Sequence, residues 1–184
     1  NMVRLMQLPD LVDRPDLKFS SFAPRYPSAF MAGNLFEAIQ KQDVLVHHPY
    51  DAFTAVSDFI RLAATDPDVV AIKQTIYRTG QTSELMESLL IAARGGKEVT
   101  VIVELMARFD EETNINWASR LEEVGAHVVF GVVGNKTHAK MCLVVRREQG
   151  RLRRYAHLGT GNYHPRTAKL YTDFGLFTAC LLYT

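Results

Sequence analysis

The stretch from Val69 to Val103, VVAIKQTIYRTGQTSELMESLLIAARGGKEVTVIV, decides the fold class of this chain. It opens with a short apolar run at 69–72, which is typical of a buried strand. Leucines at helical spacing follow a cap at Thr82 or Ser83, and Gly95-Gly96 predicts the end of that helix. A second apolar run closes the stretch. This order predicts a βαβ unit with two parallel strands and a right-handed crossover.

The alternation of helix and strand continues on both sides of this unit. Upstream, Asp51 is expected to cap a helix. Downstream, a third helix is predicted to end at Gly125, with a third strand at 127–130. Three more strands are expected at 139–146, 152–158 and 171–178, the first two as an antiparallel hairpin. The sequence therefore predicts an α/β fold, a mixed sheet of βαβ units plus an antiparallel hairpin, flanked by helices.

Composition narrows the class of protein. Of 184 residues, 47% are hydrophobic and 22% charged, which is typical of a folded globular chain. The net charge of +1 gives no indication of a nucleic-acid partner. Two cysteines without metal-ligand spacing, Cys142 and Cys180, favour a reducing compartment, so we expect a cytoplasmic protein. No apolar run approaches the length of a transmembrane segment, which leaves at most a peripheral membrane association.

Residues 1–45 differ from the rest of the chain. Four of the seven prolines lie within the first 27 residues, so regular structure there should be short and interrupted. We expect 1–45 to be the tail of a preceding helical domain plus a linker, and 46–184 to be a separate domain. The abrupt ends, including residues 181–184, suggest a piece of a longer protein.

Basic and polar residues follow strand ends that should meet at one edge of the predicted sheet. Ligands of open α/β sheets bind beyond the carboxyl ends of the parallel strands. Arg78 and Arg108 come just after the first two strands of the βαβ series. His138 begins the hairpin, and its second strand returns to the same edge at His157, ahead of Asn162. Connectivity therefore predicts a cationic rim at this edge.

The residue types at this rim suit phosphate. Arginine offers a planar fork of donors that matches phosphate oxygens. His138 and Lys140 are two apart on an expected strand, so both should project from one face. There the imidazole could attack phosphorus while the ammonium neutralises charge. The alternate, apolar positions are predicted to face the core: Ala139, Met141, Leu143 and Val145.

Other polar residues have simpler interpretations. Asp173 is either a turn former at a strand end or a site residue. The remaining histidines are interpreted as structural or surface residues: His47, His48, His127 and His164.

Several long segments of the chain closely resemble one known family. They are residues 71–80, 104–111, 136–140, 157–163 and 171–173. In order and spacing they are similar to the catalytic region of bacterial polyphosphate kinase, the type with a phosphohistidine intermediate. The resemblance runs from His48 to Phe177. It implies a phospholipase-D-like fold for 46–184, as a truncated catalytic domain whose partner domain, with the second half of the site, lies outside this sequence.

The resemblance also implies an activity and a set of site residues. The activity is reversible transfer of the terminal phosphate of ATP to polyphosphate through a phosphohistidine, with His138 as the phosphorylated residue. The other implied catalytic residues are Lys140, Asp173 and His157. The implied phosphate and ATP ligands are Arg78, Arg108, Tyr171 and Asn162. Mg²⁺ is the implied cofactor, placed at Arg78 and Arg108 only through bound phosphate, because a guanidinium cannot ligate a metal ion. The implied partners are ATP or ADP, polyphosphate, the remainder of the same chain, and further copies in a homo-oligomer.

Two other hypotheses stay open from the sequence. One is a phospholipase-D-like phosphodiesterase or nuclease that completes its site as a homodimer, with one HxK motif per chain. Val145 stands where that motif would have Asp, which weakens this reading. The other is a folded but inactive piece. We expect the 184-residue chain alone to turn over poorly or not at all.

Overall fold

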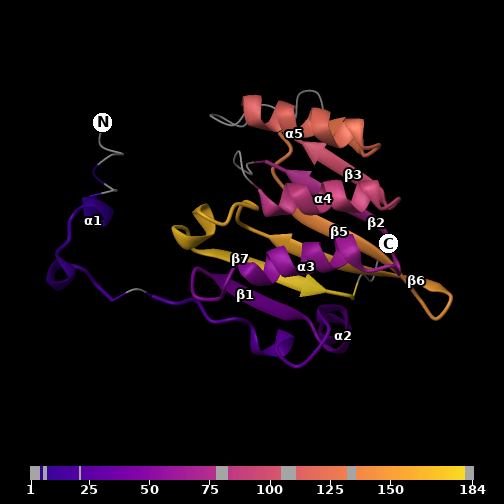
Figure 1. Cartoon of the computed structure of the whole chain (residues 1–184). Helices are drawn as coiled ribbons and strands as arrows, with labels where there is room; N and C mark the ends of the chain where they lie inside the picture. Colours follow the sequence, from indigo (N-terminus) through magenta and orange to yellow (C-terminus); the bar gives the residue numbers. More distant parts are fainter. Residues whose placement is uncertain are drawn as a thin grey trace.

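A seven-stranded mixed sheet forms the centre of the computed structural model, which describes residues 5, 8–20, 22–77, 83–104, 111–131 and 136–180. Across the sheet the strands run in the order β1-β7-β6-β5-β2-β3-β4 (Figure 1). Their bounds are β1 Val44–His48, β2 Val69–Ile76, β3 Glu98–Val103, β4 His127–Phe130, β5 Lys140–Glu148, β6 Arg151–Gly159 and β7 Asp173–Thr178. Strands β2, β3 and β4 are parallel, and the other neighbouring pairs are antiparallel.

The longer helices form one layer against this sheet (Figure 1). They are α2 Leu35–Lys41, α3 Thr54–Thr65, α4 Glu84–Arg94 and α5 Glu111–Glu123, beside the short helix α1 Leu8–Leu11 and 3-10 turns at Pro15–Leu17, Ser28–Phe30 and Thr167–Lys169. Because β2, β3 and β4 follow one another across the sheet, right-handed crossovers place α4 and α5 on the same side. The Ser83 hydroxyl accepts from Met86 N at 3.4 Å, and Gly96 ends α4 with φ +80°. The predicted βαβ unit is confirmed.

The hairpin is also confirmed. Strands β5 and β6 pair antiparallel from Lys140↔Gly159 to Glu148↔Arg151. Between them Gln149 and Gly150 have φ of 49° and 77°, as the two central residues of a tight type I′ turn require.

Strand β5 shows which face of the sheet is buried. Cys142 and Val144 are fully buried toward the helices, in the same core as Phe36 and Phe59. The prediction that the alternate residues face the core is wrong: Met141, Leu143 and Val145 lie half-buried on the opposite face, and Ala139 is exposed ahead of the strand. Because β5 is apolar on both faces, its own pattern does not decide the question. The helix layer decides it by covering one face only.

Strand β1 was not expected from the sequence. It pairs antiparallel with β7, with Val44 opposite Phe177 and His48 opposite Asp173. The expected boundary between residues 45 and 46 falls within this strand, and Phe30, Phe36 and Ile39 before it belong to the core. The division into a tail and a separate domain stays a prediction. Residues 8–20 and 22–25 are exposed, and Figure 1 shows them running away from the sheet.

Asp51 does not cap α3, contrary to the expectation. The helix begins only at Thr54, and no side chain caps it. The Asp51 carboxylate instead accepts hydrogen bonds from His47 N and from Arg25 Nε, both at 2.8 Å. It therefore closes the turn after β1 and ties residue 25 to the domain.

Candidate active site

The strand ends converge as the sequence predicts. Strands β2 and β3 end at Ile76 and Val103, at the edge where β5 and β7 begin and β6 ends. Lys140 faces Gly159, which faces Gly175 on β7. We call this edge the rim, meaning His138, Lys140, Asn162 and Asp173 with the turn at 159–161. Arg78 and Arg108 lie outside the described residues, so their place at the rim stays a prediction.

His138 and Lys140 are in contact, but not through strand alternation. Strand β5 begins at Lys140, and His138 precedes it. The Lys140 ammonium donates to the main-chain oxygen of His138 at 2.7 Å and lies 3.0 Å from both of its ring nitrogens. Lys140 is only 7% exposed, whereas His138 is exposed. The rim thus presents an accessible imidazole with an ammonium fixed beside it.

The electrostatic surroundings favour the neutral form of the His138 ring. Partial burial lowers its pKa below the usual value of 6.5, and the ammonium groups of Lys140 and Lys136 lower it further, while Glu104 opposes them. Burial also lowers the pKa of Lys140, against an opposing effect of Asp173. A neutral imidazole has a free lone pair, which a nucleophile needs.

Tyr77 is a neighbour of the rim that sequence reasoning missed. Its ring lies 5.0 Å from that of His138 in an edge-to-face arrangement. The ammonium groups of Lys140 and Lys136 lie 5.2 and 5.8 Å from its centroid. An aromatic face attracts cations, so Tyr77 helps to hold both at the rim. Its place directly after β2, one residue before Arg78, was the available signal.

Glu104 and Asn114 hold the strand ends and the loop before His138. The Glu104 carboxylate, on a residue only 5% exposed, accepts from Thr137 N at 2.7 Å. The Asn114 amide donates to the main-chain oxygens of Tyr77 and Glu104, both at 3.0 Å. These bonds tie α5 to the ends of β2 and β3 and fix the chain one residue ahead of His138.

Asp173 is held by the turn that follows β6. Thr160 Oγ1 donates to its carboxylate at 2.8 Å and accepts from Phe174 N at 2.9 Å. A Cβ atom on Gly161 would overlap the carboxylate, so only glycine lets the turn approach this closely. The glycine-rich turn is therefore needed to place Asp173 at the rim.

His157 lies beneath the rim rather than on it. It is 3% exposed, and its Nδ1 is 2.8 Å from the Tyr163 hydroxyl. Burial, together with the neighbouring His48, lowers its pKa to about 3. A Cβ atom on Gly175 would lie 2.6 Å from His157 Nε2, so the missing side chain makes room for the ring. A direct catalytic contact of His157 stays a prediction.

The other two predicted ligands lie at the same edge. Tyr171 precedes β7 and is 64% exposed. Asn162 follows the glycine-rich turn, with its side-chain oxygen buried. Together with His138, Lys140 and Asp173, the structure thus brings five predicted residues to one edge.

The residues at hand do not fit Mg²⁺ as direct ligands. In the part of the chain that the structure describes, no group of three or more His, Cys, Asp or Glu side chains could hold a metal ion. Mg²⁺ prefers oxygen ligands, whereas two ammonium groups, of Lys140 and Lys136, act on His138 more strongly than the one carboxylate, of Glu104.

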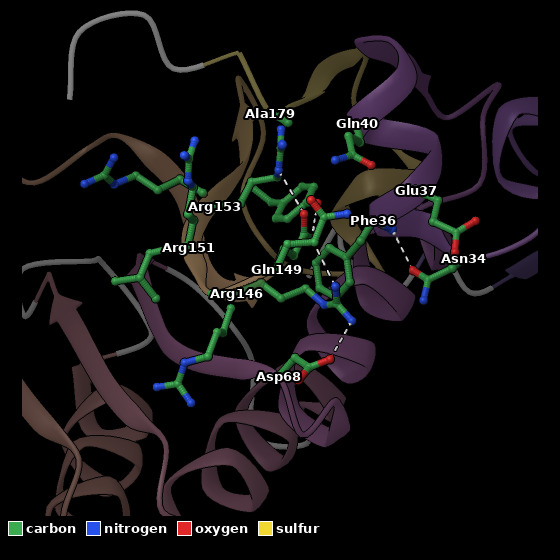
Figure 2. Close-up of a pocket in the computed structure, with 16 residues that line it drawn as sticks. Asn34, Phe36, Glu37, Gln40, Asp68, Arg146, Gln149, Arg151, Arg153 and Ala179 are labelled. Carbon is green, nitrogen blue, oxygen red and sulfur yellow. Dashed lines mark hydrogen bonds and ion pairs between the residues drawn. The ribbon is translucent and has the colours of Figure 1, made fainter.

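Two large cavities among the described residues lie away from the rim. One, of about 1140 Å³, lies between α3, α4 and residues 165–169. The other, of about 1090 Å³, lies between α2 and the hairpin (Figure 2). Five arginines line it, and two of them, Arg146 and Arg153, pair with carboxylates. None of the described helices is long and apolar enough to cross a membrane.

Comparison with known proteins identifies the family. The family described as polyphosphate kinase C-terminal domain 1 matches residues 34–182. A curated polyphosphate kinase of Burkholderia lata is 68% identical to this chain, and one of Paraburkholderia phytofirmans is 65% identical. Each match covers 97% of this chain. The chain spans 27% of the length of these relatives.

Two solved structures are similar to this chain. A crystal structure of polyphosphate kinase from Porphyromonas gingivalis matches with a TM-score of 0.77 and 33% identity, over 92% of this chain and 26% of that one. Nuc from Salmonella typhimurium, a phospholipase D family member, matches with a TM-score of 0.54 and 11% identity, over 74% of this chain and 81% of that one. The second likeness shows the fold alone, α/β and phospholipase-D-like. The chain belongs to the polyphosphate kinase family, in which it matches C-terminal domain 1.

Proposed function

We propose that this chain is part of an ATP:polyphosphate phosphotransferase and supplies the histidine that carries the phosphoryl group. The polyphosphate kinase names of the relatives support ATP, ADP and polyphosphate as substrates. The accessible imidazole of His138 beside the fixed ammonium of Lys140, which lowers the pKa of the ring, is the observation that carries the proposal. Transfer is reversible, and the intact protein acts in the cytoplasm as a homo-oligomer.

In the first step a ring nitrogen of His138 attacks the γ-phosphorus of ATP with its lone pair. The new N–P bond forms as the bond between phosphorus and the β,γ-bridging oxygen breaks, and ADP leaves with the electron pair. The other ring nitrogen keeps its proton, so the ring gains a positive charge that the phosphoryl oxygens balance. In the second step a terminal oxygen of polyphosphate attacks the same phosphorus and frees the imidazole.

The neighbouring groups act on charge and orientation. The Lys140 ammonium, 3.0 Å from the ring nitrogens, attracts the phosphoryl oxygens. Asp173 raises the pKa of Lys140 and so favours its charged form. Arg78, Arg108, Tyr171 and the Asn162 amide bind phosphate or nucleotide in this proposal. Mg²⁺ would arrive with the ATP phosphates, and no step is assigned to it.

Labelling with γ-³²P-ATP tests the proposal in the full-length protein. Wild type is expected to take up label that is acid-labile and base-stable, and His138→Ala is expected to take up none. His127→Ala is the matched control, because His127 is exposed on β4 away from the rim. Label that persists in His138→Ala, or polymer synthesis without any labelled protein, would overturn the phosphohistidine step. The 184-residue chain alone is expected to show little turnover.

A further inference from the structure

A small cavity lies beneath the rim, between β1, β6 and the loop that follows β6. Its volume is about 10 Å³. One buried water molecule needs roughly 10–15 Å³, so the space suits a water and no larger ligand. His48, His157 and Asn162 line it, together with the rim residue Asp173.

Three buried polar atoms of these residues share one property. Within the described part of the chain, none of His48 Nε2, His157 Nε2 and Asn162 Oδ1 has a hydrogen-bond partner. His48 is 4% exposed and His157 3% exposed. A buried polar atom left unpaired is costly to the folded state, and native proteins avoid it. Three such atoms on residues that line one cavity of water size indicate a shared partner.

The hydrogen-bond geometry fixes the roles of two of these atoms. His48 Nδ1 lies 2.8 Å from the main-chain oxygen of Asp51. Because a carbonyl oxygen only accepts, Nδ1 carries the proton, and Nε2 of the neutral ring is an acceptor. The Asn162 side-chain oxygen is an acceptor as well. A water molecule in the cavity would donate one hydrogen to each.

The role of His157 follows from the hydrogen bonds that the water can still form. With both hydrogens donated, a water molecule can only accept, so His157 Nε2 must carry the ring proton. The Tyr163 hydroxyl, 2.8 Å from Nδ1, then donates to that nitrogen. All three unpaired atoms are satisfied by this single arrangement.

We propose that His48, His157 and Asn162 bind one buried water molecule, and that His48 is a positioning residue of the rim. The water holds the Asn162 amide with its oxygen inward, which leaves the NH₂ group for an anion outside. It also ties β1 to β6 through the two imidazoles. The site rests on the cavity and its lining and does not require that His138 be phosphorylated.

Nitrogen NMR of the ¹⁵N-labelled 184-residue chain at pH 7 tests the proposal directly. His48 is expected as the Nδ1–H tautomer and His157 as the Nε2–H tautomer. A nuclear Overhauser effect to a long-lived water is expected at the His157 ring protons. His157 found as the Nδ1–H tautomer, or no long-lived water at its ring, would overturn the site.

Two variants of His48 distinguish a role in holding the water from a role in packing alone. His48→Phe removes the acceptor, so we expect the water signal to disappear and His157 to change to the Nδ1–H tautomer, with the Tyr163 hydroxyl donating to His157 O at 3.3 Å. His48→Gln keeps an acceptor and should retain both wild-type signals. His47→Phe is the matched control, since His47 stacks on Phe174 instead. An unchanged His157 tautomer in folded His48→Phe would refute the role. If that variant does not fold, the wild-type tautomers still decide the matter.

Discussion

The two ends of strands β5 and β6 differ in whether their charged side chains form ion pairs. At the turn end, Arg146 binds Asp66 and Glu148 at 3.0 Å and Asp68 at 3.1 Å. At the rim end, no carboxylate of the described residues lies within ion-pair distance of Lys140, which instead contacts His138. Paired charges fix a structure, whereas groups left unpaired are available to a ligand. The turn end is therefore the one held by paired charges, and the rim end is the one proposed to bind phosphate.

The turn end forms a closed network around Glu148. Its carboxylate accepts from the Tyr155 hydroxyl at 2.5 Å and from Arg153 at 2.9 Å, besides Arg146. Burial alone would raise the pKa of Glu148, but the hydrogen bonds from Tyr155 and Arg146 outweigh it and lower the pKa. The network joins the hairpin to the α3–β2 turn (Figure 2).

The largest predicted effect is the loss of the Arg146 charge. Arg146→Met should lower the free energy of unfolding by roughly 3–5 kcal/mol, because it leaves the buried carboxylate of Asp66 without its ion-pair partner and removes one of the three partners of Glu148. Urea unfolding followed by circular dichroism measures the change.

Arg151→Met provides the matched control for that experiment. Arg151 is exposed on the same hairpin, and no ion pair of it is found among the described residues. Its replacement should change stability by at most about 0.5 kcal/mol. Equal losses in the two variants would contradict the assignment of stability to the Arg146 network.

Local patterns in the sequence predicted the parts of the fold that local physics determines. The Ser83 cap, the glycine ends of α4 and α5, and the hairpin turn depend on neighbours along the chain. Strand β1 depends on pairing with β7, more than a hundred residues away in sequence, and no signal near Val44 required it. The buried face of β5 also needed the helix layer, because both faces are apolar.

The features of the candidate site also divide into those that the local sequence predicted and those that depend on distant contacts. Spacing brought His138, Lys140 and Asp173 to one edge, because strand connectivity carries that information. It could not show that His157 is buried, or that His48, interpreted as structural or surface, lines a cavity beside it. Those facts depend on the missing side chain at Gly175 and on β1.

Acid is predicted to lower the stability of the rim end mainly through protonation of His157. Its pKa falls from 6.5 to about 3 on folding, so the unfolded chain binds the proton first. The stability that this shift provides is fully present above about pH 6.5 and is lost as the pH falls toward 3. Between pH 6.5 and pH 4 the wild type should lose about 3 kcal/mol more than His157→Gln. Urea unfolding across this range measures the difference.

An exposed histidine supplies the control for the acid experiment. His127→Gln, on β4, should follow the wild-type pH dependence. Parallel stability curves for wild type and His157→Gln would show that His157 is not held neutral by the fold.

The smallest predicted effect sharpens the comparison at the rim itself. Lys140→Met should raise the pKa of His138, because it removes one of the two ammonium groups that, after burial, lower it. Lys136→Met should raise it less, since Lys136 contributes less than Lys140. Lys169→Met, in the 3-10 turn before β7, should leave it unchanged. NMR titration of the His138 ring measures all three. An unchanged pKa of His138 in Lys140→Met would mean that the Lys140 ammonium does not act on the imidazole. The rim end would then lose the feature that distinguishes it from the turn end.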